Sequence, residues 1–177
     1  MKKLAIIIII FSLLSSCKSK EDKLFERVYS QKLKYPKSLE NLNPNIDSTK
    51  NYFASRVKII SIANLGCGEC CVNLSKLGKW IESFNNSDIS LIVYNYDMYP
   101  HSSIIGFMAI APDFKFPIFA DSLKTVLKLN NLPENNVLYH TFLIDSKNSI
   151  HVIGSPVLSE KIAELYKKEI FKILNGK

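Results

Sequence analysis

The chain has 177 residues, of which 47% are apolar, and a formal net charge of +7. This length is enough for one domain with a substantial core and a short appendage, and the composition is ordinary for a globular protein. The lysines are interleaved with acidic residues and form no one-sided basic stripe on any expected helix, so the charge indicates a solvated surface and no nucleic-acid partner.

Residues 1–16 have the pattern of an export signal. Lys2 and Lys3 precede an apolar run over residues 4–14, which is too short to span a bilayer and is followed by a polar segment. The small residues before Cys17 resemble the lipobox of bacterial lipoproteins. This resemblance implies cleavage before Cys17, a diacylglycerol thioether on its sulfur and acylation of the new amine. The alternative is an uncleaved anchor in which Cys17 is incidental.

Both interpretations place the remainder of the chain outside the cytoplasm, tethered to a membrane. We therefore expect a location in the bacterial cell envelope, with a lipid anchor at the N-terminus and the folded domain facing the periplasm. Compartments of this kind tolerate disulfides, so the cysteines of the chain are expected in a setting that favours redox chemistry.

Residues 17–50 are expected to form a tether and an N-terminal extension. Residues 18–23 are charged and lack hydrophobic periodicity, whereas the apolar residues that follow are spaced to share one face of a short helix. Residues 41–51 are rich in Asn, Ser and Asp, which is typical of a loop. The folded domain is therefore expected over residues 51–177.

From residue 51 onward, strand patterns alternate with helix patterns. The run over residues 57–63 suits a buried central strand, and the helix after it places its apolar residues on one face. This alternation predicts an α/β fold, in which a central mixed sheet has helices on both faces and the site lies at the carboxyl ends of the strands. Further elements are expected in chain order: a strand over residues 89–94, a helix over 103–111, an edge segment over 116–119, a helix capped by Asp121 or Ser122, a strand over 139–145, a hairpin strand over 150–153 and a helix opened by Ser159.

Cys67 and Cys70 stand three residues apart, after the first expected strand and at the start of the following helix. The free N–H groups and the dipole at a helix N-terminus favour a thiolate at Cys67, and Cys70 lies one turn further on, where it can close a disulfide. No second CxxC motif or Cys/His pair supplies a tetrahedral zinc site, so redox activity is favoured over zinc binding. A structural disulfide without turnover is the alternative.

With these residues the sequence resembles the thioredoxin-like superfamily and, within it, the membrane-tethered redoxins related to TlpA and to the alkyl hydroperoxide reductase group. The resemblance covers residues 52–174 and rests on the strand, CxxC motif and helix, on residues 116–121 and on the hairpin over 141–149. It implies a three-layer sandwich in which Cys67 attacks a protein disulfide and Cys70 resolves the mixed intermediate. It also implies exported protein thiols and disulfides as substrates and electrons from a redox partner protein. No nucleotide or flavin motif is present, so no cofactor is expected.

The chain departs from this family at several positions near the cysteines. Gly66 stands where many relatives have Trp, and Ser75 replaces a Pro that kinks the helix. Tyr139 or His140 occupies the place of the cis-Pro that faces the cysteines, positions the substrate backbone and keeps metals off the thiolates. Tyr139 and His140 are therefore candidates for facing a metal or a substrate.

Cys71 supports an alternative function. It falls on the apolar face of the helix, where a buried cysteine is the ordinary interpretation, but Cys67 and Cys71 also form a Cx3C motif. With His140 as a third ligand this set resembles the Sco-type copper proteins of the same fold, and two thiolates with one imidazole suit copper. A further alternative is a non-catalytic binding lipoprotein with a structural disulfide. His101 and His151 are expected at the surface.

Overall fold

The computed structural model describes residues 19–46 and 49–176. The export signal expected over residues 1–16 and the lipidation expected at Cys17 lie outside the described residues. Within the described ranges, no helix is long and apolar enough to cross a membrane.

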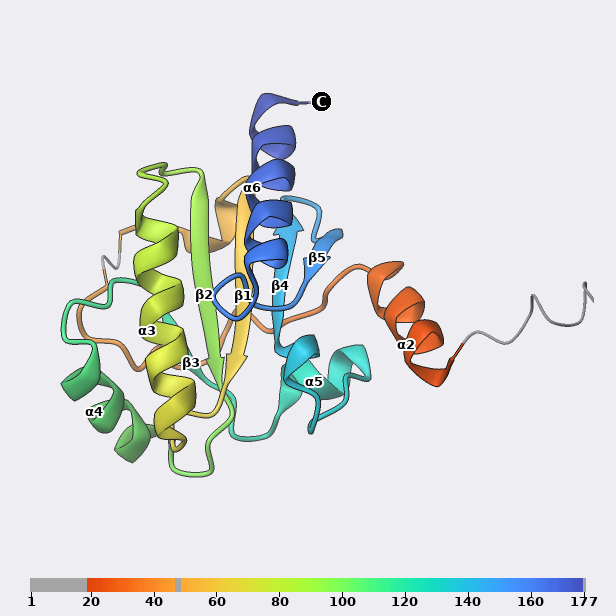
Figure 1. The fold of residues 1–177 in the computed structure, drawn as a ribbon. Helices are drawn as coiled ribbons and strands as arrows, with labels where there is room; N and C mark the ends of the chain where they lie inside the picture. Colours follow the sequence, from red (N-terminus) through yellow and green to blue (C-terminus); the bar gives the residue numbers. More distant parts are fainter. Residues whose placement is uncertain (1–18, 47–48, 177) are drawn as a thin grey trace, which may run out of the picture.

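A five-stranded mixed sheet, counted over the described residues, forms the centre of the molecule with the strand order β3-β2-β1-β4-β5 (Figure 1). β1 pairs parallel with β2 and antiparallel with β4, β2 pairs parallel with β3, and β4 pairs antiparallel with β5. The expected mixed sheet is confirmed. The strands are β1 Val57–Ala63, β2 Ile89–Asn95, β3 Ile118–Ala120, β4 Thr141–Asp145 and β5 Ile150–Ile153.

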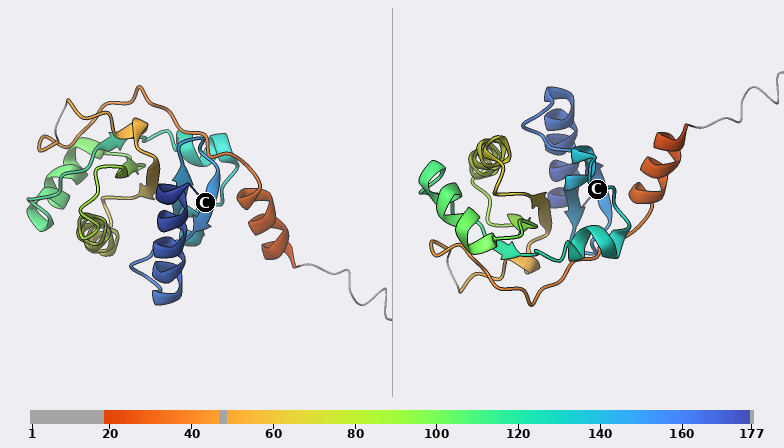
Figure 2. Two further views of the ribbon diagram at one scale, coloured as in Figure 1. Left: turned by 90° about the horizontal axis from the view of Figure 1, so that it is seen from above. Right: turned by 90° about the horizontal axis from the view of Figure 1, so that it is seen from below.

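Helices cover both faces of the sheet (Figure 2). α3 and α6 pack on one face together with α4, whereas α2 and α5 pack on the other face with two 3-10 turns. The structure is therefore the three-layer sandwich that was expected. The helices are α2 Lys20–Tyr29, α3 Gly68–Glu82, α4 Pro100–Ile110, α5 Thr125–Asn130 and α6 Glu160–Asn175, and the turns are Tyr52–Ala54 and Val137–His140.

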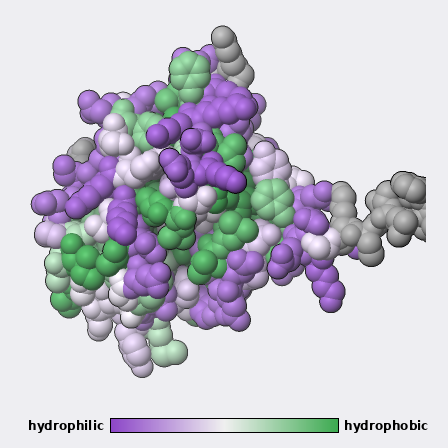
Figure 3. Space-filling view, viewed as in Figure 1, coloured by the Kyte–Doolittle hydropathy of each residue, from purple (hydrophilic) through white to green (hydrophobic). Residues whose placement is uncertain are grey.

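β1 lies at the centre of the core because every one of its residues is buried. Its side chains alternate between two apolar clusters: Val57 and Ile59 belong to the cluster under α3 and α6, whereas Ile60 and Ile62 belong to the cluster under α2 and α5. A β-branched run suits a strand that is covered on both faces. Seen from the side of α3 and α6, apolar side chains gather between these two helices and hydrophilic ones surround them (Figure 3).

The N-terminal extension packs on the domain. The charged segment expected as a tether is helical from Lys20, because Ser19 and Asp22 form a capping box that satisfies free N–H groups of the first turn. Val28 and Leu33 are fully buried in the cluster under α2 and α5. The extension therefore contributes to the same core as the strands of the sheet.

Two local features place the segments around the site. The N-cap residue of α5 is Lys124, but Asp121 provides the carboxylate that the sequence indicated for this helix start, since it accepts hydrogen bonds from the Thr125 and Val126 N–H groups at 2.7 and 3.0 Å. The strand expected over residues 139–145 instead begins at Thr141, because a 3-10 turn occupies Val137–His140. His140 therefore ends a turn directly before β4.

Candidate functional site

Cys67 is the N-cap residue of α3. The loop after β1 brings it to the first turn of the helix, where its sulfur accepts a hydrogen bond from the Cys70 N–H at 3.4 Å. The Cys67 carbonyl accepts a helical hydrogen bond from the Cys71 N–H at 3.0 Å. The Cys67 sulfur thus lies where the free N–H groups and the dipole of α3 stabilise negative charge. The structure brings Cys67 and Cys70 together at the carboxyl end of β1, as expected.

The two thiols of the CxxC motif differ in acidity. The pKa of Cys67 is lowered because the Cys70 thiol, and then the Cys70 N–H, donate hydrogen bonds to its sulfur. Burial, together with the hydrogen bond to Cys67 and that residue's negative charge, raises the pKa of Cys70 to about 12. Both cysteines are free in the structure. Cys67 is thus suited to attack a disulfide, whereas Cys70 keeps its proton until a base removes it.

A buried amide, Asn95, holds the loop before Cys67. Its Oδ1 accepts hydrogen bonds from the Leu65 N–H at 3.2 Å and from the Asp97 N–H at 3.1 Å, and its Nδ2 donates to Ser103 Oγ at 3.0 Å. Asn95 is completely buried at the end of β2. The sequence patterns did not predict this role, although an amide that ends an apolar strand was the available signal.

Gly66 lies directly against the carboxylate of Asp97. A Cβ atom at position 66 would lie 2.1 Å from Oδ2 of Asp97, well inside contact distance. The other carboxylate oxygen of Asp97 accepts a hydrogen bond from the Tyr99 N–H at 2.7 Å, which restrains the side chain. The departure from Trp at position 66 thus has a local cause, because the carboxylate of Asp97 lies against the backbone there.

A cavity of about 410 Å³ lies beside the CxxC motif. Cys67 and Cys70 line one part of it, and Tyr96, which follows β2, and His140, which precedes β4, line another. Leu158, in the segment before α6, adds an exposed apolar side chain. The cavity therefore joins the two thiols to an imidazole and to an apolar surface.

Tyr139 and His140 lie in different surroundings. Tyr139 does not face the cysteines, because its side chain is buried in the cluster under α2 and α5. His140 is the residue of this pair that lines the cavity. Every peptide bond in the described part of the chain is trans, so the place expected for a cis-Pro is taken by an ordinary trans segment that ends in His140.

Burial lowers the pKa of the His140 imidazole, which favours its neutral form. Its Nε2 lies 3.4 Å from the Pro133 carbonyl oxygen. The ring of Tyr96 stands nearly perpendicular to it, with the two ring centroids 5.9 Å apart. A carbonyl oxygen only accepts hydrogen bonds, so this contact favours the tautomer with the proton on Nε2 and the lone pair on Nδ1.

Cys71 does not belong to the cavity. Its thiol is buried in the cluster under α3 and α6 and donates a hydrogen bond to the Leu65 carbonyl at 3.2 Å. Burial raises its pKa. The part of the chain that the structure describes contains no group of three His, Cys, Asp or Glu side chains that could hold a metal ion. The copper set of Cys67, Cys71 and His140 is therefore not assembled, because the helix turns Cys71 into the core.

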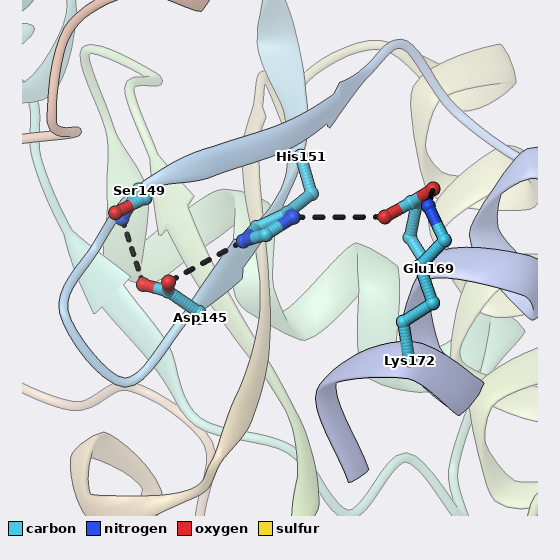
Figure 4. Close-up of polar contacts among 5 residues, drawn as sticks. All are labelled: Asp145, Ser149, His151, Glu169 and Lys172. Atoms are coloured by element: carbon cyan, nitrogen blue, oxygen red, sulfur yellow. Dashed lines mark hydrogen bonds and ion pairs between the residues drawn. The ribbon is translucent and has the colours of Figure 1, made fainter. Parts of the chain in front are cut away.

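The other two histidines lie away from the cysteines. His101 is exposed at the surface, as expected. His151 is only partly exposed and lies between two carboxylates, with Nε2 at 3.3 Å from Asp145 and Nδ1 at 3.7 Å from Glu169 (Figure 4). Asp145 pairs in register with Val57 at the start of β1, whereas the CxxC motif follows the end of β1. The network therefore lies at the opposite end of the strands from the CxxC motif.

No protein-family model matches the sequence, and no curated protein matches it. Solved structures do resemble it. The thioredoxin domain of a thiol–disulfide oxidoreductase from Bacteroides vulgatus shares 14% identity and a TM-score of 0.54, and the match covers 78% of this chain and 97% of that one.

Two further solved structures give a similar likeness. AhpC of Enterococcus faecalis shares 11% identity with a TM-score of 0.54, over 71% of this chain and 81% of that one. The bacterioferritin comigratory protein of Xanthomonas campestris, whose alkyl peroxide reduction activity is described, shares 14% identity with a TM-score of 0.51, over 67% and 80%. Likeness at such low identity concerns the fold alone. The strand order, the helices on both faces of the sheet and these neighbours show that the chain has the thioredoxin fold.

Proposed function

We propose that this chain is a thiol–disulfide oxidoreductase that exchanges disulfides through Cys67 and Cys70. The observation that carries the proposal is the position of Cys67 at the N-cap of α3, where its pKa is lowered, beside a Cys70 whose thiol stays protonated. This division between an ionised attacking thiol and a protonated second thiol is what ordered disulfide exchange requires.

The exchange has two steps. The Cys67 thiolate attacks one sulfur of a substrate disulfide, a mixed disulfide forms, and the other substrate sulfur leaves as a thiolate. Cys70 then loses its proton and attacks Cys67 Sγ, so that the Cys67–Cys70 disulfide forms and the second substrate thiolate leaves with the electron pair. The substrate gains two electrons and the motif loses two. The reverse sequence oxidises a substrate dithiol.

The proposed enzyme works at the end of a lipid tether. The lipobox before Cys17 supports a lipoprotein in the bacterial cell envelope, which exchanges disulfides with exported proteins and is reset by a redox partner protein. Metabolic labelling with palmitate tests the anchor. Label and membrane fractionation are expected for the full chain and should be lost in Cys17→Ala. Membrane retention of Cys17→Ala without label would instead identify an uncleaved anchor.

Insulin reduction by the full-length chain in dithiothreitol tests the chemistry. The unsubstituted chain should accelerate insulin precipitation, Cys67→Ser should abolish the effect, and Cys70→Ser should lose most of it because the mixed disulfide is no longer resolved. Cys71→Ser is the matched control and should retain activity, since this buried side chain does not line the cavity. Equal rates with and without the unsubstituted chain would contradict the proposal and favour a binding lipoprotein with a structural disulfide.

A trapping experiment identifies the substrates. In Cys70→Ala the mixed disulfide between Cys67 and a substrate cannot be resolved from within the motif. Exported proteins that carry disulfides should then accumulate as reducible adducts, which mass spectrometry can identify. The double variant Cys67→Ser, Cys70→Ala should trap none of them, and adducts that persist in it would show that another thiol carries the exchange.

A further inference from the structure

The second step of the proposed exchange needs a base, and the one carboxylate within the motif, Glu69, is exposed to solvent. In the mixed disulfide Cys67 carries no charge, and Cys70 must still lose a proton that burial and the neighbouring charge of Glu69 hold. Cys67 cannot take that proton at this stage, because its sulfur is bonded to the substrate in the mixed disulfide. A side chain that accepts this proton has to reach Cys70 from the cavity that Cys70 lines.

We propose that the imidazole of His140 accepts the proton of the Cys70 thiol as Cys70 attacks the mixed disulfide. This inference rests on the proposed function. His140 and Cys70 line the same cavity of about 410 Å³, which has room for a bridging water molecule. Tyr96 interacts with both residues: its ring packs edge-on against His140, and its hydroxyl interacts electrostatically with Cys70.

His140 is prepared for this role by its surroundings. It is almost fully buried, at 6% exposure, and its contact with the Pro133 carbonyl favours a proton on Nε2 and a lone pair on Nδ1. Burial keeps the ring neutral, so the lone pair is available at physiological pH. The Glu134 carboxylate is close enough to stabilise the imidazolium that forms when the ring takes a proton.

The other polar groups of the cavity wall are less suitable. Burial raises the pKa of Tyr96, so its hydroxyl stays protonated and accepts no proton at neutral pH. Glu69 is exposed to solvent on the first turn of α3. Glu134 does not line the cavity, and it forms an ion pair with Lys124, whose ammonium lies over the Tyr96 ring. His140 is thus the neutral nitrogen base among the residues that face Cys70.

The Cys70 S–H bond breaks and its proton goes to Nδ1 of His140, directly or through the bridging water. The Cys70 thiolate forms a bond to Cys67 Sγ, and the bond between Cys67 and the substrate sulfur breaks. The substrate leaves as a thiolate with the electron pair, and the imidazolium returns its proton to that thiolate or to solvent.

Stopped-flow reaction of the reduced full-length chain with 5,5′-dithiobis(2-nitrobenzoate) separates the two steps. The first thiol released reports attack by Cys67, and the second reports attack by Cys70, which the loss of that phase in Cys70→Ser confirms. In His140→Gln the first phase should be unchanged. The second should slow at least tenfold at pH 7, because a positioned base contributes roughly 10²–10⁴ to a proton transfer.

The pH profile distinguishes a base from a residue that only supports the fold. In the unsubstituted chain the second phase should be nearly flat between pH 7 and pH 9, because neutral His140 is already fully formed there. In His140→Gln it should rise steeply with pH, toward tenfold per unit, because it then follows the thiolate fraction of Cys70, whose pKa burial raises. His101→Gln, at an exposed histidine, is the matched control and should keep the flat profile.

Chemical rescue provides a second variant. His140→Ala leaves a gap in the cavity wall, and added imidazole should restore its second phase in proportion to its concentration while leaving the first phase unchanged. Unchanged second-phase rates and profiles in both variants would overturn the assignment to His140. Absence of the second phase from the unsubstituted chain would overturn the proposed disulfide exchange itself, and the two failures are therefore distinguishable.

Discussion

Cys67 and Cys70 have the same chemistry, and their positions on α3 make them different. Cys67 is the N-cap and receives hydrogen bonds from the thiol and the N–H of Cys70. Cys70 lies within the first turn, where burial and the charge of its neighbour oppose ionisation. The asymmetry therefore comes from one turn of helix rather than from any difference in residue type.

Alkylation of the reduced chain with iodoacetamide tests this asymmetry. At pH 7, Cys67 should be modified at least about a hundredfold faster than Cys70, because each unit of pKa difference changes the thiolate fraction about tenfold. Cys71, buried in the core, should react only after unfolding. Peptide mass spectrometry of timed samples measures the three rates, and equal modification of Cys67 and Cys70 would contradict the structure.

The contact between Gly66 and Asp97 gives a second prediction. Gly66→Ala should destabilise the fold by about 1–3 kcal/mol, because its Cβ would overlap the carboxylate of Asp97. In the Asp97→Ala background the same substitution should cost at least about 1 kcal/mol less, a coupling that a double-mutant cycle in urea measures. Gly68→Ala is the control and should cost nothing, since open space surrounds Gly68. Additive effects of Gly66→Ala and Asp97→Ala would exclude the contact.

At the scale of elements, a polar network ties the β4–β5 hairpin to α6 (Figure 4). Asp145, at the end of β4, accepts hydrogen bonds from the Lys147 and Ser149 N–H groups and contacts His151 of β5. His151 in turn contacts Glu169 of α6. The last helix is therefore attached to the sheet by polar contacts as well as by apolar packing, at the end of the strands opposite the cysteines.

This network predicts an acid-dependent loss of stability. Burial raises the pKa of Asp145, but the hydrogen bonds from Ser149, His151 and Lys147 outweigh it, and the net pKa lies below the ordinary 3.8. A folded-state pKa below the unfolded one stabilises the fold above about pH 4, and the contribution is lost as pH falls through the folded value. Urea midpoints should therefore drop between pH 5 and pH 3.

Asp145→Asn should flatten that drop. The exposed Asp113→Asn, which provides the matched control, should keep the full pH dependence. Fluorescence of Trp80, the single tryptophan of the chain, reports the transition because its ring packs against Tyr166 of α6. An equal pH dependence in Asp145→Asn and in the unsubstituted chain would show that protonation of the Asp145 carboxylate does not cause the loss of stability in acid.

At the scale of the whole molecule, the N-terminal extension belongs to the folding unit. The backbone N–H of Leu33 donates a hydrogen bond to the Asn148 carbonyl in the β4–β5 turn at 2.9 Å. Asn43 is buried and donates to the Phe114 and Phe116 carbonyls at 2.9 and 2.8 Å before β3. The extension therefore contacts the segments at both edges of the sheet, and its removal would uncover apolar core.

Leu33→Ala tests this integration. It should lower the free energy of unfolding by about 2–5 kcal/mol, because it leaves a cavity in a site that is 1% exposed, while unfolding remains a single transition. Leu123→Ala, at a side chain that is 74% exposed, should change stability by no more than about 0.5 kcal/mol. A separate early transition for the extension, with the Trp80 signal unaffected, would place the domain boundary after it.

The order of strands and helices, the position of the CxxC motif at a helix start and the carboxylate of Asp121 at another helix start were all predictable from the sequence. Each depends on residues within one or two turns of each other, and hydrophobic periodicity and capping chemistry act at that range. The sequence also placed either Tyr139 or His140 where relatives have a proline. It does not distinguish the two, because the pattern over residues 139–145 predicts a strand, whereas both residues lie in a 3-10 turn.

The amino-acid sequence by itself thus determined a thioredoxin-type alternation with two thiols at its active edge. Only the tertiary structure decided what surrounds them: Cys71 is turned into the core, Asp97 lies against Gly66, and His140 shares a cavity with Cys70. The physical reason is distance along the chain. These contacts join segments that the fold brings together, and neither residue spacing nor periodicity records which distant side chains will meet.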